Sequence, residues 1–269
     1  MPRFALTITL ALLAALALPA HAAAAHVFLE DMSSPELQDA LSHGATTIII
    51  PVGGTEQNGP HMALGKHNVR VKVLAGRIAT TLGKTIVAPV LPYVPEGSIN
   101  PPRMHMRWAG TISISDEAFK GVLDGAARSF RQHGFTDIVL IGDHGGYQSQ
   151  LAAVAAKLNH DWAGSPARAH FVADYYLATQ SAFIQALRAA GVGEAQIGTH
   201  AGTADTALML ATDAALVNPD EFPAAAKGAP ANGVAGDPRA ATAALGKLGT
   251  DGVVNATVNA IRAALSARH

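Results

Sequence analysis

Three separate segments of the chain place carboxylates and imidazoles beside glycines. The first reads GGTEQNGPHMALGKHN and covers residues 53–68, the second reads GDHGG, and the third reads HAGTAD. Their metal-capable side chains are Glu56, His61 and His67 in the first, Asp143 and His144 in the second, and His200 and Asp205 in the third. Metal-dependent hydrolysis uses this mixture of ligands, because it fixes a divalent ion and leaves positions for water and substrate.

Each of these side chains could also have a purely structural role. Glu56 could accept hydrogen bonds from loop amides, because a buried carboxylate needs a partner. Asp205 could cap a helix that begins in TALMLA. Gly145 and Gly146 after His144 would let the backbone approach a ligand or adopt a positive φ angle. From the residues alone, the first segment is either a metal site or a polar turn.

A predicted strand leads into each of the first two polar segments. Residues 46–52 form a β-branched run that is apolar on both faces, as expected for a buried parallel strand. The sequence DIVLIGDHGG reads as another strand that runs into the glycine-rich loop with His144. In such sheets, ligands bind in the crevice outside the carboxyl ends of the strands. Both polar loops are therefore expected at that edge.

Strands and helices alternate along most of the chain. The remaining strands are predicted at 85–94 and 167–176, and helices at 34–43, 68–83, 116–134, 147–162 and 179–191. This order predicts an α/β fold, a three-layer α/β/α sandwich with a mostly parallel sheet. A Pro, Ala and Gly-rich stretch at 218–236 is interpreted as a surface excursion, followed by helical segments at 240–249 and 253–265.

The amino-terminal residues 1–23 are expected to be a secretory signal peptide. Arg3 precedes an apolar run at 4–18, and AHA supplies small residues for cleavage near Ala23. The run is shorter than the roughly 20 apolar residues that a spanning helix needs. We expect a periplasmic or secreted protein with one domain at 24–269 and no membrane association after cleavage.

Composition excludes several functions. The chain has no cysteine, which rules out disulfides, a thiolate nucleophile and cysteine-ligated metal. The net charge is -1 with neutral histidines, and the basic residues are scattered. Nucleic acid is therefore not expected as a partner.

The motifs together resemble the creatininase family, creatinine amidohydrolase and its relatives. PVGGTEQNGPHMALGKHN, IGDHGG and HAGTADTA are similar to family segments that typically read PVGSxEQHGPHLPLxTD, NGHGGN and HAGExETS. GTISIS and GDPRAATAALGK also match, and the matches follow the family order across the mature chain. The resemblance implies an α/β/α sandwich with a metal centre, often dinuclear, that hydrolyses a C–N bond in a cyclic or linear amide.

Four residues of this chain correspond to functional positions of the family. Glu56 stands where the family has its first glutamate ligand, and His144 matches the histidine ligand of NGHGGN. Asp205 takes the place of the glutamate before the TS pair. His200 matches the histidine that opens HAGExETS and resembles a catalytic proton carrier. The resemblance thus implies His200 and Asp205 as catalytic residues.

The chain departs from the family at ligand positions. Asn58 replaces a histidine, His67 replaces a bridging aspartate, and Thr203 stands where a glutamate is often found. Two dications repel each other and need a shared anion, which a neutral imidazole cannot supply. We therefore expect one ion per chain, Zn²⁺ with Mn²⁺ or Fe²⁺ as alternatives, held by Glu56, His67, His144 and Asp205. The residues expected to contact substrate or support the ligands are Asn58, His61, Asp143, Gly145 and Gly146.

Two functions are compatible with this sequence. The first is an exported metal-dependent amidohydrolase that acts on a small cyclic or linear amide, with His200 or Asp205 carrying the proton to the departing nitrogen. The second is a catalytically silent periplasmic protein that binds a small molecule on the same fold. The resemblance also implies a closed homo-oligomer, a hexamer, and the alanine-rich surfaces at 240–265 offer small apolar faces for its contacts.

Overall fold

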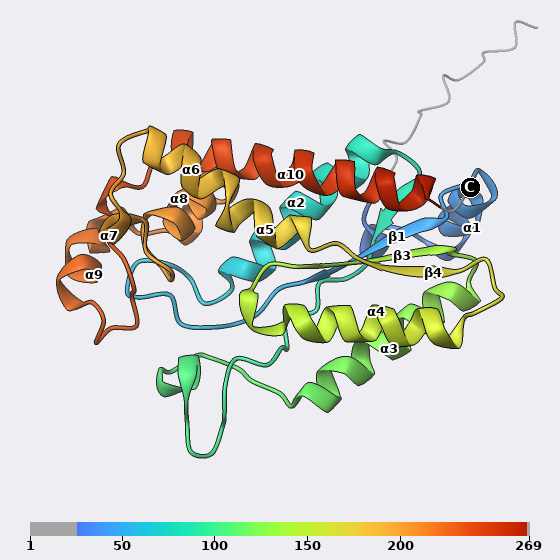
Figure 1. Cartoon of the computed structure of the whole chain (residues 1–269), viewed down its shortest axis with the longest axis horizontal. Helices are drawn as coiled ribbons and strands as arrows, with labels where there is room; N and C mark the ends of the chain where they lie inside the picture. Colours follow the sequence, from blue (N-terminus) through green and yellow to red (C-terminus); the bar gives the residue numbers. More distant parts are fainter. Residues whose placement is uncertain (1–25, 268–269) are drawn as a thin grey trace, which may run out of the picture.

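A parallel sheet forms the centre of the computed structural model, which describes residues 26–267. In this part of the chain the sheet has four strands in the order β2-β1-β3-β4 (Figure 1). The strands are β1 (Thr47–Val52), β2 (Thr85–Val87), β3 (Asp137–Gly142) and β4 (Arg168–Phe171). Val52 pairs with Gly142 at the carboxyl end of the two central strands. The loops after β1 and β3 therefore begin side by side.

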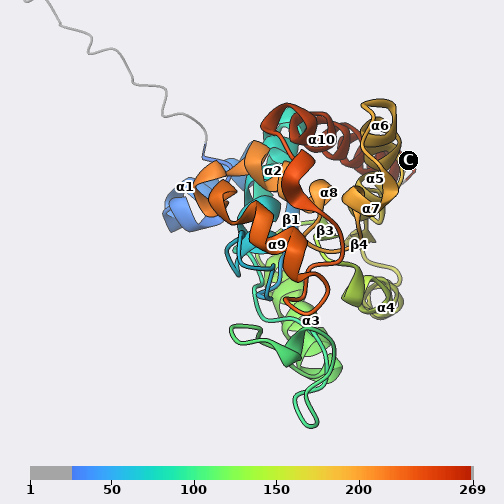
Figure 2. The same cartoon turned by 90° about the vertical axis from the view of Figure 1, so that its left-hand side faces the viewer.

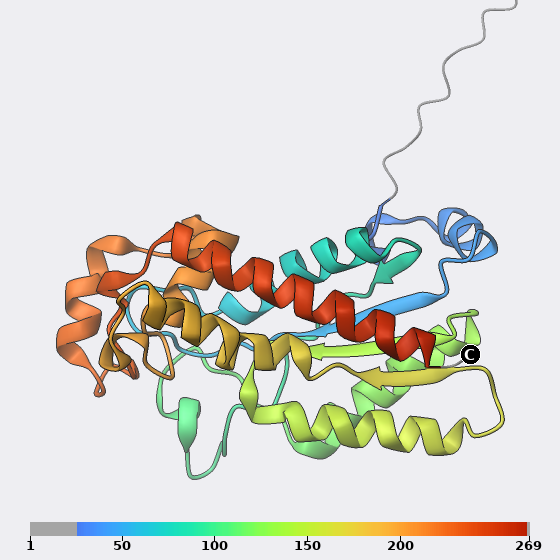
Figure 3. The same ribbon diagram turned by 45° about the horizontal axis from the view of Figure 1, so that its top comes forward.

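Helices cover both faces of the sheet. The helices are α1 (Ser34–Ser42), α2 (Lys66–Leu82), α3 (Asp116–Gln132), α4 (Gln148–Asp161), α5 (Asp174–Gln180), α6 (Ala182–Ala189), α7 (Glu194–Ile197), α8 (Thr203–Thr212), α9 (Phe222–Gly228) and α10 (Ala243–Ser266). Ile48 and Ile50 face a cluster with apolar residues of α1, α3 and α4. Ile49 faces a second cluster with residues of α2, α5 and α10. These three helices lie over one face of the sheet (Figure 3). The predicted three-layer α/β/α sandwich is confirmed.

The carboxyl edge of the sheet is covered by the chain from α7 to α9. Figure 2 looks at this end of the molecule and shows α7, α8 and α9 in front of the strands. The stretch at 218–236 contributes the buried side chains of Ala225 and Val234 to an apolar cluster with Met62 and Met209. The stretch that reads as a surface excursion therefore also packs against the loop after β1, through Met62.

Several elements differ from the sequence-based predictions. The strand predicted at 85–94 is shorter, because β2 ends at Val87. The end of the predicted strand at 167–176 is helical, because α5 begins at Asp174. The two predicted carboxy-terminal helical segments form one helix, α10, of 24 residues. This helix continues through Gly246 and Gly249. A Cβ at either position would collide with α8 or α6. These glycines permit close packing between helices.

The start of α2 matters most for the site. The helix was predicted to begin at Asn68, but it begins at Lys66 after an N-cap at Gly65. Lys66, His67 and Arg70 therefore share the first turns of one helix, where all three side chains are buried.

The predicted signal peptide lies outside the described residues. Within residues 26–267, no helix is both long enough and apolar enough to cross a membrane.

Candidate metal centre

Glu56 is the centre of a cluster of imidazoles. It follows β1 in the loop, and its side chain is fully buried. Its Oε1 lies 2.8 Å from His67 Nε2 and 3.7 Å from His200 Nδ1. Its Oε2 lies 3.2 Å from His105 Nε2 and 3.7 Å from His144 Nε2. One carboxylate is thus surrounded by histidines from four different segments.

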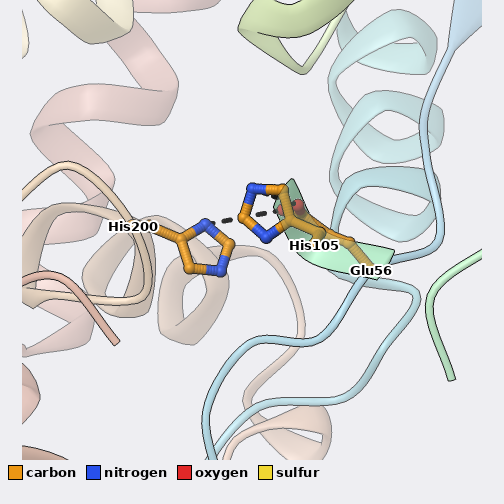
Figure 4. A group of neighbouring side chains, drawn as sticks. All are labelled: Glu56, His105 and His200. Carbon is orange, nitrogen blue, oxygen red and sulfur yellow. Dashed lines mark ion pairs between the residues drawn. The ribbon is translucent and has the colours of Figure 1, made fainter. Parts of the chain in front are cut away.

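Two overlapping sets of ligand atoms emerge from this cluster. In the described part of the chain, Glu56 forms one set with His67 and His144 and another with His105 and His200 (Figure 4). Within each set the ligand atoms lie within 4.8 Å of one another. Glu56 Oε2 is buried and accepts no hydrogen bond among residues 26–267. Because an unpaired buried carboxylate oxygen is costly, this atom fits a divalent ion better than it fits a structural turn.

His67 is held at both ring nitrogens. Nδ1 lies 2.6 Å from Asp143 Oδ2, and Nε2 points at Glu56. Burial and Lys66 lower the pKa of His67, but the hydrogen bonds to Asp143 and Glu56 raise it overall. Histidine ligands commonly donate the second ring N–H to a carboxylate, which fixes the tautomer. Asp143 is placed to accept that hydrogen bond when Nε2 binds an ion.

His144 is neutral and lies at the carboxyl end of β3. Burial lowers its pKa to about 3, so the imidazole can act as a ligand. Its Nδ1 lies 3.2 Å from Gly146 N and 3.5 Å from Glu96 Oε2.

The Tyr147 hydroxyl lies 2.8 Å from the carbonyl oxygen of Val52. Tyr147 therefore holds the ends of β1 and β3 together and fixes the distance between the two loops.

His200 offers an unprotonated nitrogen to the cluster. Its Nε2 lies 2.9 Å from the Gln57 carbonyl oxygen, so Nε2 carries the proton and donates it. Burial lowers the pKa of His200 to about 4. The Nδ1 lone pair of the neutral ring therefore faces Glu56.

Asp205 lies apart from both ligand sets. Lys66 Nζ lies 3.0 Å from its Oδ2, and Arg70 Nη1 lies 3.2 Å from its Oδ1. The Ala201 amide also donates to Oδ2. Burial alone would raise the pKa of Asp205. The positive charges of Lys66 and Arg70 outweigh this effect and hold the pKa well below its usual value. Of the four expected ligands, the structure groups Glu56, His67 and His144 but not Asp205, because two cations hold that carboxylate.

The other predicted site residues support the loops. Asn58 donates to the carbonyl oxygens of Glu56 and Ala63, both at 2.9 Å. His61 Nε2 lies 3.0 Å from the Thr206 hydroxyl. A Cβ at Gly145 would collide with the Tyr176 hydroxyl, and one at Gly146 would crowd the ring of His144.

Several residues of this centre could not be recognised from the sequence. His105 belongs to the segment between β2 and α3, part of which extends away from the body at the bottom of Figure 1, but His105 itself lies against Glu56. It occupies a short 3₁₀ helix and has no strand or glycine signal beside it. Lys66 was missed because α2 starts earlier than predicted, and Arg70 was missed because nothing in the predicted helix indicates that its side chain is buried. Glu96 was missed although its side chain is fully buried, and neither of its oxygens has a hydrogen-bond partner in the described chain.

A cavity of about 260 Å³ opens beside the cluster. It is lined by His67, His144 and His200 together with Lys66, Arg70 and Asp205. Its size suits a small molecule, and its wall is mostly polar and charged.

The comparison with known proteins identifies the family. The family model for creatinine amidohydrolase matches residues 30–261. This chain belongs to the creatininase family. The resemblance predicted from the motifs is confirmed.

Curated relatives of the chain are hydrolases with different substrates in their names. Over 120 residues the chain is 31% identical to a 3-dehydro-scyllo-inosose hydrolase of Thermotoga maritima, covering 44% of this chain and 36% of that protein. Over 119 residues it is 31% identical to a mycofactocin precursor peptide peptidase of Mycolicibacterium smegmatis, covering 42% and 45%. A creatinine amidohydrolase of Pseudomonas putida is 26% identical over 204 residues, covering 72% and 75%. The matches to the first two relatives span less than half of those proteins.

Solved creatininase structures share the fold. A structure described as Creatininase Mn has a TM-score of 0.72 at 23% identity and covers 88% of this chain and 98% of its own. A mutant creatininase of the Zn-Zn type has a TM-score of 0.69 at 24% identity, covering 88% and 97%.

Proposed function

We propose that this chain is an exported, metal-dependent amidohydrolase that cleaves a C–N bond in a small cyclic or linear amide. The observation that carries this proposal is the buried Glu56, whose Oε2 lacks a hydrogen bond in the described chain and faces imidazoles. One divalent ion would be held by Glu56, His67 and His144. Nitrogen and oxygen donors of this kind suit Zn²⁺, with Mn²⁺ or Fe²⁺ as alternatives.

The ion would polarise the amide carbonyl and lower the pKa of a water molecule. The protein must then move the proton of that water. His200 suits this role because its neutral ring has a lone pair at Nδ1 beside Glu56 and its Nε2–H is fixed on Gln57. After accepting the proton at Nδ1, the imidazolium can donate it to the departing nitrogen.

Asp205 has a different role in this proposal from the ligand and catalytic roles expected for it. Its two oxygens are paired with Lys66 and Arg70, so coordination of an ion would require both pairs to break. We assign Asp205 to holding these cations beside the cavity.

One observation favours the alternative of a silent binding protein. Glu56 Oε1 already contacts His67 and lies 3.4 Å from Lys66 Nζ. These contacts compensate the buried negative charge of Glu56. The folded protein therefore needs less positive charge from a bound ion.

Metal analysis and an activity screen separate the two functions. Purified protein is assayed for bound metal by mass spectrometry and then screened on lactams, hydantoin-like rings, formamides and peptides, before and after chelation. The amidohydrolase proposal expects about one ion per chain, hydrolysis of at least one amide, loss of activity with chelator and recovery with Zn²⁺ or Mn²⁺. A metal-free protein that binds small amides without cleaving them supports the silent alternative.

Export and assembly are further parts of the proposal. Cleavage near Ala23 rests on the sequence pattern, and a hexamer rests on the family resemblance. Intact-mass measurement on periplasmic protein should show loss of the first 23 residues, and light scattering at micromolar concentration should report a hexamer.

A further inference from the structure

Lys66 is a buried ammonium between two carboxylates. The residue is 1% exposed, and its Nζ lies 3.0 Å from Asp205 Oδ2 and 3.4 Å from Glu56 Oε1. An ammonium is strongly hydrated, and its burial is costly unless anions compensate it. Here the two anions come from different segments, the loop after β1 and α8.

These contacts belong to a closed ring of alternating charge. Glu56, Lys66, Asp205, Arg70, Asp143 and His67 each contact the next, and His67 returns to Glu56. Every contact in the ring lies between 2.6 and 3.4 Å. The three basic residues all lie at the amino-terminal end of α2.

This placement opposes the field of the helix. The amino-terminal end of a helix carries partial positive charge, so a cation there is disfavoured. The carboxylates of the ring must offset this cost as well as the cost of burial. An exposed lysine on the same helix, Lys72, pairs with Glu30 and has no such cost, because its side chain is 45% exposed.

We infer that Lys66 occupies a latent divalent-cation site between Glu56 and Asp205, and that its ammonium excludes an ion from that position. The ligand class is a hard or borderline dication bound through carboxylate oxygens. Removing the ammonium leaves the buried carboxylate of Glu56 and the carboxylate of Asp205, whose side chain is 20% exposed, facing a gap. Two carboxylates without a cation between them attract a dication. Threonine is uncharged and shorter than lysine, so Lys66→Thr removes the ammonium and opens space.

This inference rests on the proposed function in one respect only, because it assumes a neighbouring ion held by Glu56, His67 and His144. It does not depend on hydrolysis, because its readout is the number of ions bound. The substitutions are Lys66→Thr, which removes the ammonium and opens space, and Lys66→Gln, which is neutral but keeps an amide to hydrogen-bond with Asp205 and sustain folding. Lys66→Arg keeps the charge, and Lys72→Thr is the matched surface control.

The experiment is a Mn²⁺ titration of the full chain. Calorimetry measures the number of ions bound, and electron paramagnetic resonance detects coupling between them. Wild type, Lys66→Arg and Lys72→Thr should share one stoichiometry. Lys66→Thr and Lys66→Gln should each bind one additional ion per chain, and the resonance spectrum should show magnetic coupling because both ions would contact Glu56. If Lys66→Thr is insoluble without metal, its refolding in Mn²⁺ with the additional ion supports the same conclusion, and Lys66→Gln remains the test.

Two results distinguish failure of this inference from failure of the proposed function. An unchanged stoichiometry in soluble Lys66→Gln would overturn the latent site, whatever the wild type binds. A wild type that binds no Mn²⁺ would overturn the metal-dependent function, and a gain of one ion in the neutral variants would still support the latent site.

Discussion

Replacement of Asp143 by asparagine should strongly destabilise the metal-free protein. The Asp143 side chain is 1% exposed and accepts from His67 at 2.6 Å, from Arg70 at 2.8 Å and from Tyr175 at 2.8 Å. Asn keeps the size of the side chain but removes its charge, so the Arg70 guanidinium keeps only Asp205 as a counter-ion. Breaking a buried ion pair from one side costs about 3–5 kcal/mol of unfolding free energy.

A surface aspartate provides the control. Asp124 pairs with Arg128 and Lys157, whose side chains are 40% and 59% exposed. Pairs of this kind contribute about 0–1 kcal/mol, so Asp124→Asn should change little. Both variants are unfolded in urea at neutral pH with chelator present, and the unfolding free energies are compared with that of the wild type. A loss below about 1 kcal/mol for Asp143→Asn would refute the view that the ring of ion pairs stabilises the site.

The other predictions concern single side chains around the centre. His144→Ala should abolish metal binding and Asn58→Ala should leave its stoichiometry unchanged, both measured by titration. Glu96→Gln should weaken binding of the ion by roughly 10 to 100-fold, because it removes the carboxyl group that faces His144 Nδ1 and whose pKa burial raises to about 8; an unchanged affinity would dismiss this positioning role. His200→Ala should lower kcat while the bound metal stays constant. Burial lowers the pKa of His61 to about 4, below the unfolded value of about 6.5, so the unfolded state binds more protons in that interval. Stability should therefore fall as the pH drops from 6.5 towards 4, and the slope in chelator should be shallower in His61→Gln.

The sequence predicted the convergence of Glu56, His67 and His144 for a general physical reason. Residues that follow neighbouring parallel strands meet at one edge of the sheet, and β1 pairs directly with β3. Asn58 is buried and belongs to neither ligand set. This agrees with its expected role as a hydrogen-bonding residue.

Sequence patterns could not predict the partners of Asp205. Lys66 and Arg70 look like solvent-exposed basic residues, and only the tertiary packing of the first turns of α2 places both beside the cavity. His105 was equally hidden, because its segment lacks periodicity and folds back over the site from far away in the sequence. Contacts of this kind depend on tertiary packing, which local propensity and spacing do not encode.

The most direct test of the metal centre is anomalous diffraction from crystals grown with Zn²⁺. Data collected on both sides of the zinc absorption edge locate the ion without reference to activity. We predict one strong peak per chain, within coordination distance of Glu56, His67 Nε2 and His144 Nε2, with Lys66 still between Glu56 and Asp205. The absence of a peak at Glu56, or a peak coordinated by Asp205 in place of Lys66, would contradict this account.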